Sequence, residues 1–173
     1  VTATTIGVLA AWCFTHGEAH LMILGAVFLQ LSAVIDCVDG DIARMLHKET
    51  KAGKWLDLGG DQLVHLFLLA GIGVGLWHME GQTGPTLWLG VAAALGVVLS
   101  FLTILRAEQS QHPHLRLKKF LAKTANRDFS VLLVILAIAE RVQWFLWIAL
   151  LAVHVFWLYG AWLRQKDELE EAQ

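Results

Sequence analysis

The chain of 173 residues is 57% hydrophobic and 16% charged, with a mean hydropathy of +0.58, which excludes an ordinary soluble domain. Its formal net charge of −2 excludes the basic surface of a nucleic-acid-binding protein. Its two cysteines, Cys13 and Cys37, lie in apolar segments without a CxxC spacing, which excludes a disulfide framework or a cysteine zinc site.

The first half of the chain contains three apolar segments, each of which we expect to form a transmembrane helix. The first, residues 2–15, is short, and a brief polar break separates it from the second, residues 20–43. The third covers residues 54–77. Acidic residues occur only in the last third of the second segment and in the first third of the third segment. Both sets therefore lie beside the polar turn that joins these two helices.

The second half of the chain contains three more apolar segments. The fourth segment, residues 86–105, is followed by a long polar connection at 106–128, and the Glu140–Arg141 pair separates the last two, 129–140 and 143–163. Segments 86–105 and 143–163 carry no formal charge, and as helices each is about 30 Å long, the thickness of a bilayer's hydrocarbon core. The chain is therefore predicted to be an all-α integral membrane protein with six transmembrane helices, two of them short.

The domain organisation predicted from this pattern is simple. We expect a single six-helix membrane domain over residues 1–166 and a soluble, charged C-terminal tail over residues 167–173. Because the chain begins with Val1 rather than methionine, we also expect further residues upstream of it.

The distribution of basic residues predicts the orientation of the six helices. In a six-span arrangement, every one of the 13 lysines and arginines except Arg141 falls on the same side of the membrane. Loops rich in lysine and arginine remain in the cytoplasm. The end of helices 2 and 3 that carries the acidic residues is therefore expected to face the cytoplasm.

The acidic residues of helices 2 and 3 form two helical faces. One face has residues at i, i+3, i+4 and i+7, and the other repeats every four residues. The members of the two faces are Asp36, Asp39, Gly40, Ala43 and Gly53, Asp57, Asp61. If the helices pack antiparallel, four carboxylates converge and need bound cations. Oxygen ligands favour Mg²⁺, Mn²⁺ or Ca²⁺ over zinc, and two ions are expected to clamp a diphosphate, with Arg44 beside them.

Two alternatives remain open for this acidic cluster. Arg44 and Lys54 would neutralise two of the four acids in a purely structural ion-pair network, but such a network does not account for the glycines. A membrane cation transporter would also place acids within helices. A transport path, however, is expected to carry its acids near the middle of the bilayer and on several helices, whereas these acids lie at one boundary.

The two faces together resemble the signature of the CDP-alcohol phosphotransferase family. The spacing Asp36-x2-Asp39-Gly40-x2-Ala43-Arg44-x8-Gly53-x3-Asp57-x3-Asp61 matches that signature at every fixed position. The hydropathy pattern is similar to the family's six-helix membrane fold, so the resemblance covers nearly the whole chain. The resemblance implies transfer of a phospho-alcohol from a CDP-linked donor to a hydroxyl acceptor with release of CMP, and it also implies a homodimer.

The resemblance also implies roles for the residues of the motif. The four aspartates would hold two metal ions, Mg²⁺ or Mn²⁺, and Asp61 would also take the proton of the acceptor hydroxyl. The residues that would shape the CDP site are Gly40, Ala43, Arg44 and Gly53.

The identity of the acceptor is less strongly indicated. The stretch around Asp36 and the later Asn126-Arg127-Asp128 look most like family members that use inositol phosphates. A phosphorylated acceptor needs basic partners, and we consider Arg127, Arg106 and Lys51, with Arg127 favoured because Asp128 could orient it. Each of these three could equally be a simple anchor at the positive side of the membrane. Two kinds of donor fit the motif, CDP-diacylglycerol and a soluble CDP-alcohol.

Overall fold

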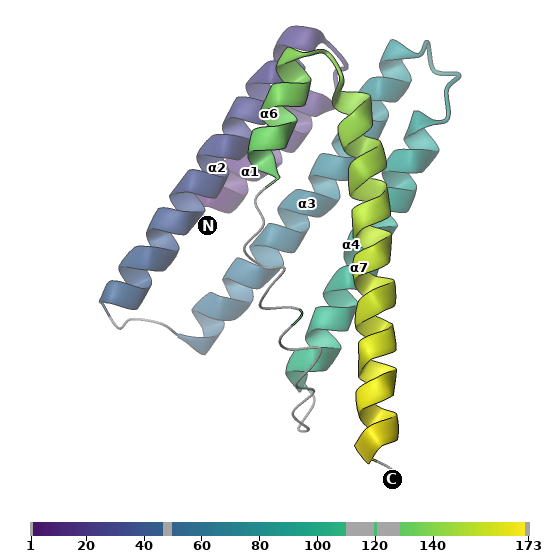
Figure 1. Cartoon of the computed structure of the whole chain (residues 1–173). Coiled ribbons are helices and arrows are strands. Elements are labelled where there is room, and N and C mark those ends of the chain that lie inside the picture. The colour runs from purple at the N-terminus through teal and green to yellow at the C-terminus, as the bar shows by residue number, and fades with distance from the viewer. Residues whose placement is uncertain (1, 47–49, 110–119, 121–128, 172–173) are drawn as a thin grey trace.

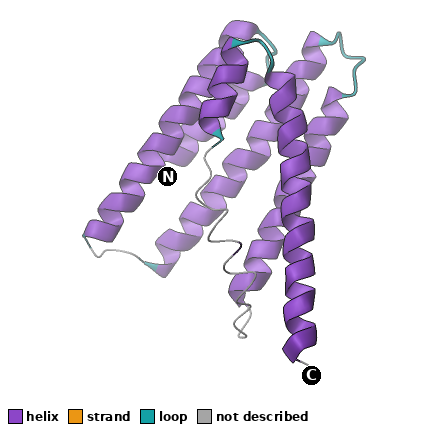
Figure 2. Ribbon diagram, viewed as in Figure 1, coloured by secondary structure: helices purple, strands orange, loops and turns teal. Residues whose placement is uncertain are grey.

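The computed structural model describes residues 2–46, 50–109, 120 and 129–171. The described residues form helices and short turns, and none of them is in a strand (Figure 2). The helices are α1 (Thr2–Phe14), α2 (Ala19–Met45), α3 (Lys51–Met79), α4 (Thr86–Gln109), α6 (Ser130–Ile138) and α7 (Val142–Glu171). The all-α prediction is therefore confirmed.

The helices form an up-and-down bundle. The last turn of α2 and the first turn of α3 lie at one end, together with the last turns of α4 and α7, and we call this the α2–α3 end (Figure 1). The turns that join α1 to α2, α3 to α4 and α6 to α7 lie at the opposite end (Figure 1). Within the bundle α3 packs mainly on α1 and α4, while α7 packs on α4 and α6 packs on α2.

Four of the helices, α2, α3, α4 and α7, are long and apolar enough to cross a membrane. They indicate an integral membrane protein, as the composition predicted. Helix α1 has 13 residues and α6 has 9, so both are short, as expected, and the count of six spans stays a prediction.

The end of the last helix differs from the sequence-based expectation. Helix α7 continues to Glu171, well past residue 163, where the apolar run ends. The polar stretch that follows contains lysine, glutamate, leucine and glutamine, which have high helix propensity. The helix therefore continues through the change from apolar to charged residues, into the predicted tail.

The core of the bundle joins side chains from distant parts of the chain. The largest fully buried ones come from α1, α3, α6 and α7 and are Phe14, Leu68, Ile72, Leu133 and Leu146. Many other large apolar side chains are exposed along α2 and α7. Such exposed apolar faces are what a lipid environment requires.

Glycines allow α3 to approach its neighbours closely. A Cβ atom on Gly73 of α3 would lie 2.6 Å from the Cα atom of Gly90 on α4. A Cβ atom on Gly71 would lie 2.5 Å from the carbonyl oxygen of Ala11 on α1. Small residues at these positions bring the backbones of membrane helices into direct contact.

We therefore expect Gly73→Ala to lower the free energy of unfolding by about 2–3 kcal/mol, because the added methyl group meets backbone atoms that cannot rotate away. Thermal unfolding of the detergent-solubilised protein measures this effect. The matched control is Gly59→Ala on the same helix, where a Cβ atom would meet nothing within 4 Å. Gly59→Ala should leave the free energy of unfolding unchanged or raise it by up to about 1 kcal/mol. Equal destabilisation by the two substitutions would contradict the close packing of α3 on α4.

Candidate active site

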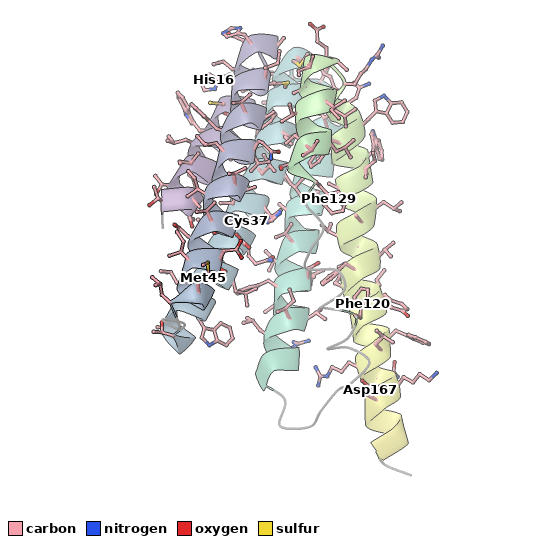
Figure 3. The ribbon with its side chains drawn as sticks, turned by 60° about the vertical axis from the view of Figure 1, so that its left-hand side comes forward. His16, Cys37, Met45, Phe120, Phe129 and Asp167 are labelled. Atoms are coloured by element: carbon pink, nitrogen blue, oxygen red, sulfur yellow. The ribbon has the colours of Figure 1, made fainter. Side chains whose placement is uncertain are left out.

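The acidic residues of the motif lie on two helices at the α2–α3 end of the bundle. Asp36 and Asp39 are in the last third of α2, and Asp57 and Asp61 are in the first half of α3. Figure 3 labels Cys37, which follows Asp36, and Met45 at the end of α2, so it shows the level of the site on that helix. The end of α2 and the beginning of α3 lie at the same end of the bundle, so both sets of acids lie near that end (Figure 1).

Helix α1 sets the distance between the two acid-bearing helices. The Ser32 hydroxyl of α2 donates a hydrogen bond of 2.7 Å to the carbonyl oxygen of Ala3. On the other side, a Cβ atom on Gly60 of α3 would lie 2.7 Å from Oγ1 of Thr4. Among the described residues, α2 and α3 thus pack on α1 rather than on each other. The acids of the two helices therefore approach one another through their side chains and not through packed backbones.

Three carboxylates converge across this arrangement. Asp36 and Asp57 come close enough for one to hydrogen-bond the other if a proton is present, and Asp61 lies near enough to both to interact electrostatically. Asp57 and Asp61 are exposed, and Asp36 is half-buried. Carboxylates this near one another repel when they are charged, so the cluster favours a bound cation.

The fourth aspartate of the motif, Asp39, also lies on α2. Asp39 is exposed, one turn further along α2 than Asp36. Within the part of the chain that the structure describes, no three His, Cys, Asp or Glu side chains stand at the spacing of a metal site. The donors are all carboxylate oxygens, the kind that Mg²⁺ and Mn²⁺ prefer. The residues therefore fit a divalent cation in chemical kind, and the expectation of two ions stays a prediction.

Gly53 belongs to the cap that begins α3. Its backbone N–H donates a hydrogen bond of 3.0 Å to Oγ1 of Thr50, the residue that precedes the helix. A Cβ atom on Gly53 would lie 3.0 Å from the same oxygen, so a larger residue would crowd the cap. Because Asp57 follows one turn later, this cap fixes the beginning of the helix that carries two of the aspartates.

Replacing Thr50 with alanine is expected to destabilise the first turn of α3 by about 1 kcal/mol, because the amide of Gly53 loses its acceptor. Hydrogen exchange followed by mass spectrometry should show faster exchange over the first turn of α3. Thr50→Ser keeps the hydroxyl oxygen and serves as the matched control, with exchange close to that of the unaltered protein. Unchanged exchange in Thr50→Ala would show that the cap does not stabilise this turn.

Other residues singled out in the sequence lie on the same two helices. On α2, Gly40 is exposed and Ala43 is half-buried. Arg44 belongs to α2 and Lys51 to α3, but their side chains lie outside the described part of the structure. His65, one turn after Asp61, has Nδ1 2.7 Å from the backbone carbonyl oxygen of Asp61, not from its carboxylate.

Of the three basic residues considered for the acceptor, Arg106 is the one whose side chain the structure describes. Arg127 lies outside the described residues. Arg106, near the end of α4, lines a cavity between α4 and α7 together with Arg164. In the sequence, Arg164 contributed only to the prediction of membrane orientation, as one of the 13 basic residues. Its position just after the last apolar run was the signal that it lies at the same end of the bundle as Arg106.

The apolar helices indicate an integral membrane protein, and it carries a group of carboxylates at one end of its bundle. A model of the CDP-alcohol phosphatidyltransferase family matches residues 1–157 of the chain. The chain belongs to this family, and the resemblance drawn from the motif is confirmed.

One curated relative gives a more specific comparison. A bifunctional IPC transferase and DIPP synthase from Aquifex aeolicus (strain VF5) is 30% identical over 80 residues, which cover 46% of this chain and 18% of that protein. The match thus spans less than a fifth of the length of the relative. No solved structure matches the chain significantly.

Proposed function

We propose that the protein transfers a phospho-alcohol group from a CDP-linked donor to a hydroxyl acceptor and releases CMP. The observation that carries this proposal is the convergence of Asp36, Asp57 and Asp61 from two helices that together hold the complete family motif. Membership of the family supports the same reaction.

The reaction needs one base and one displacement at phosphorus. Asp61 accepts the proton of the acceptor hydroxyl, and the oxygen of that hydroxyl forms a bond to the phosphorus that carries the donor's alcohol. The bridging P–O bond of the diphosphate breaks, and its electron pair leaves with CMP. The product is a phosphodiester that joins the two alcohols.

The four aspartates of the motif are the residues that would hold divalent cations, which supply positive charge opposite the phosphoryl oxygens and the departing CMP. Asp36 and Asp57 contribute from opposite helices, so a cation between them would also relieve their repulsion. The exposed Gly40 and the small side chain of Ala43 leave space beside this seat for the CDP portion of the donor.

A phosphorylated inositol is the acceptor that we favour. Two observations support this choice: the likeness of the Asp36 and Asn126-Arg127-Asp128 stretches to family members that use inositol phosphates, and the similarity to the bifunctional IPC transferase and DIPP synthase. The basic residues at the α2–α3 end support a cytoplasmic orientation of the site. The homodimer stays a prediction, with the later helices as the expected interface.

The experiment that tests the function is release of CMP by the purified protein in lipid nanodiscs with Mg²⁺. CDP-diacylglycerol and CDP-inositol are offered as donors, and inositol 1-phosphate and free inositol as acceptors. We expect CMP release that depends on both donor and acceptor. No CMP release with any pair, combined with cation flux in proteoliposomes, would instead favour the transporter.

A further inference from the structure

The ends of α2 and α3 that carry the aspartates extend beyond the packed part of the bundle. Among the described side chains of α2, Ser32 is the last one that is buried. Among those of α3, Val64 is the first one that is buried. The direction in which the aspartates point therefore depends on how each helix is held where the packing stops.

Two hydrogen bonds hold α2 at this point, one from each side. The Ser32 hydroxyl donates to the carbonyl oxygen of Ala3 on α1, at 2.7 Å. The Ser130 hydroxyl of α6 donates a hydrogen bond of 2.6 Å to Oε1 of Gln30. Gln30 and Ser32 are about 200° apart around the helix, so the two bonds lie on opposite faces of α2. Together they restrict rotation of α2 about its own axis.

The rotation of α2 decides where its aspartates point. Asp36 and Asp39 follow Ser32 by four and seven residues, so all three share one face of the helix. At Ser32 this face is turned toward α1, and α3 packs on α1 as well. Further along the same face, Asp36 comes close to Asp57 of α3. Gln30 precedes Asp36 by six residues, or about 9 Å along the helix.

The surroundings of Ser130 make its hydrogen bond costly to break. Ser130 is 6% exposed, and its helix α6 packs on α2. A buried hydroxyl that loses its partner is not rehydrated, so the free energy of that bond is not recovered. Helix α6 has nine residues, none of them acidic, and its contact with α2 is the route by which it acts on the aspartates. Figure 3 labels Phe129, the residue before Ser130, and Cys37, the residue after Asp36.

We propose that Ser130, through Gln30, is a positioning residue for the cation site: its hydrogen bond fixes the rotation of α2 that aims Asp36 at Asp57. This inference rests on the proposed function in one respect, the role of these aspartates as cation ligands. A bond that served only to hold the bundle together would affect stability and leave the affinity for the cation unchanged.

The test measures Mn²⁺ binding by the full chain in nanodiscs, from the electron paramagnetic resonance signal of free Mn²⁺, without donor or acceptor. Ser130→Ala removes the donor of the hydrogen bond, and Gln30→Met removes its acceptor and leaves α6 unaltered. Ser130→Thr keeps the hydroxyl. The matched control is Ser100→Ala on α4, because the buried Ser100 hydroxyl also donates to another helix, at 3.3 Å to the carbonyl oxygen of Val153 on α7. A thermal unfolding curve of each sample measures the accompanying loss of stability.

We expect Ser130→Ala and Gln30→Met each to weaken Mn²⁺ binding roughly three- to tenfold. The double variant should weaken it no further, because both substitutions remove the same bond. Ser130→Thr should restore most of the affinity, and Ser100→Ala should lower stability alone. Unchanged Mn²⁺ affinity in Ser130→Ala, or an equal loss in Ser100→Ala, would overturn the proposal. If Ser130→Ala does not fold, Gln30→Met is judged by the same criteria.

CMP release by the same samples separates this inference from the proposed function. If Mn²⁺ binding changes as expected but the unaltered protein releases no CMP with any donor and acceptor, the positioning role stands and the proposed reaction fails. If the unaltered protein releases CMP and Ser130→Ala binds Mn²⁺ normally, the reaction stands and the positioning role fails. An unaltered protein that binds no Mn²⁺ would also overturn the positioning role.

Discussion

Asp61→Asn should lower the rate of CMP release between about 10²- and 10⁴-fold, because asparagine cannot accept the proton of the acceptor hydroxyl. Asparagine has nearly the same shape, and Asp61 is exposed, so the fold should be preserved. The measurement is the initial rate of CMP release at saturating donor and acceptor, accompanied by a thermal unfolding curve of the same sample. A base acts in the transition state, so the loss is expected in kcat more than in KM.

Asp41→Asn is the matched control for this substitution. Asp41 is another exposed aspartate of α2, but it falls outside the face shared by Asp36 and Asp39. Its replacement removes one negative charge from the same end of the bundle and should change the rate by less than about twofold, within the range of surface charge effects. If both variants lost activity equally, the overall charge of this end, and not a base at Asp61, would control the reaction.

Removal of divalent cations by EDTA should abolish CMP release, and addition of Mg²⁺ or Mn²⁺ should restore it. The converging carboxylates of Asp36, Asp57 and Asp61 repel a diphosphate unless cations lie between them. Electrostatic stabilisation of this kind commonly contributes about 10²–10³-fold or more to the rate. The measurement is a titration of activity against free Mg²⁺ after chelation.

The substitution Asp57→Asn tests whether the aspartates hold the cations. Loss of this carboxylate should raise the Mg²⁺ concentration needed for half-maximal activity by tenfold or more, since about 1.4 kcal/mol of cation binding corresponds to a factor of ten. Asp41→Asn should leave the Mg²⁺ requirement unchanged. Full activity in EDTA would remove the cations from the mechanism and leave the aspartates without a role in holding the donor.

The helices were predictable from the sequence because long apolar runs and polar turns alternate without ambiguity. The predicted and observed ends of each helix differ by only a few residues, except at the end of α7, which continues to Glu171. That extension was missed because hydropathy marks the edge of a membrane span, while helix propensity decides where the helix ends.

The site was predictable to the level of the motif but not of its geometry. Spacing alone placed Asp36 on one helix face and Asp57 and Asp61 on another, and the structure brings these three together. The spacing did not indicate that α1 lies between the two helices, because contacts such as Ser32 with Ala3 join residues far apart in sequence. The spacing also did not indicate that Arg106 and Arg164 line the same cavity, because helices far apart in sequence leave no periodic signal.

The placement of α1 has a consequence for the proposed cation site. Because Ala3 and Thr4 contact α2 and α3 respectively, the thickness of this helix acts as a spacer for the carboxylates beyond it. A bulkier side chain at position 4 would hold Gly60, and Asp61 after it, farther from α2. A wider cation site suits a cation of larger radius, and Ca²⁺ tolerates longer and less regular coordination than Mg²⁺ does. A helix that carries no acid would thus influence which cation the proposed site prefers.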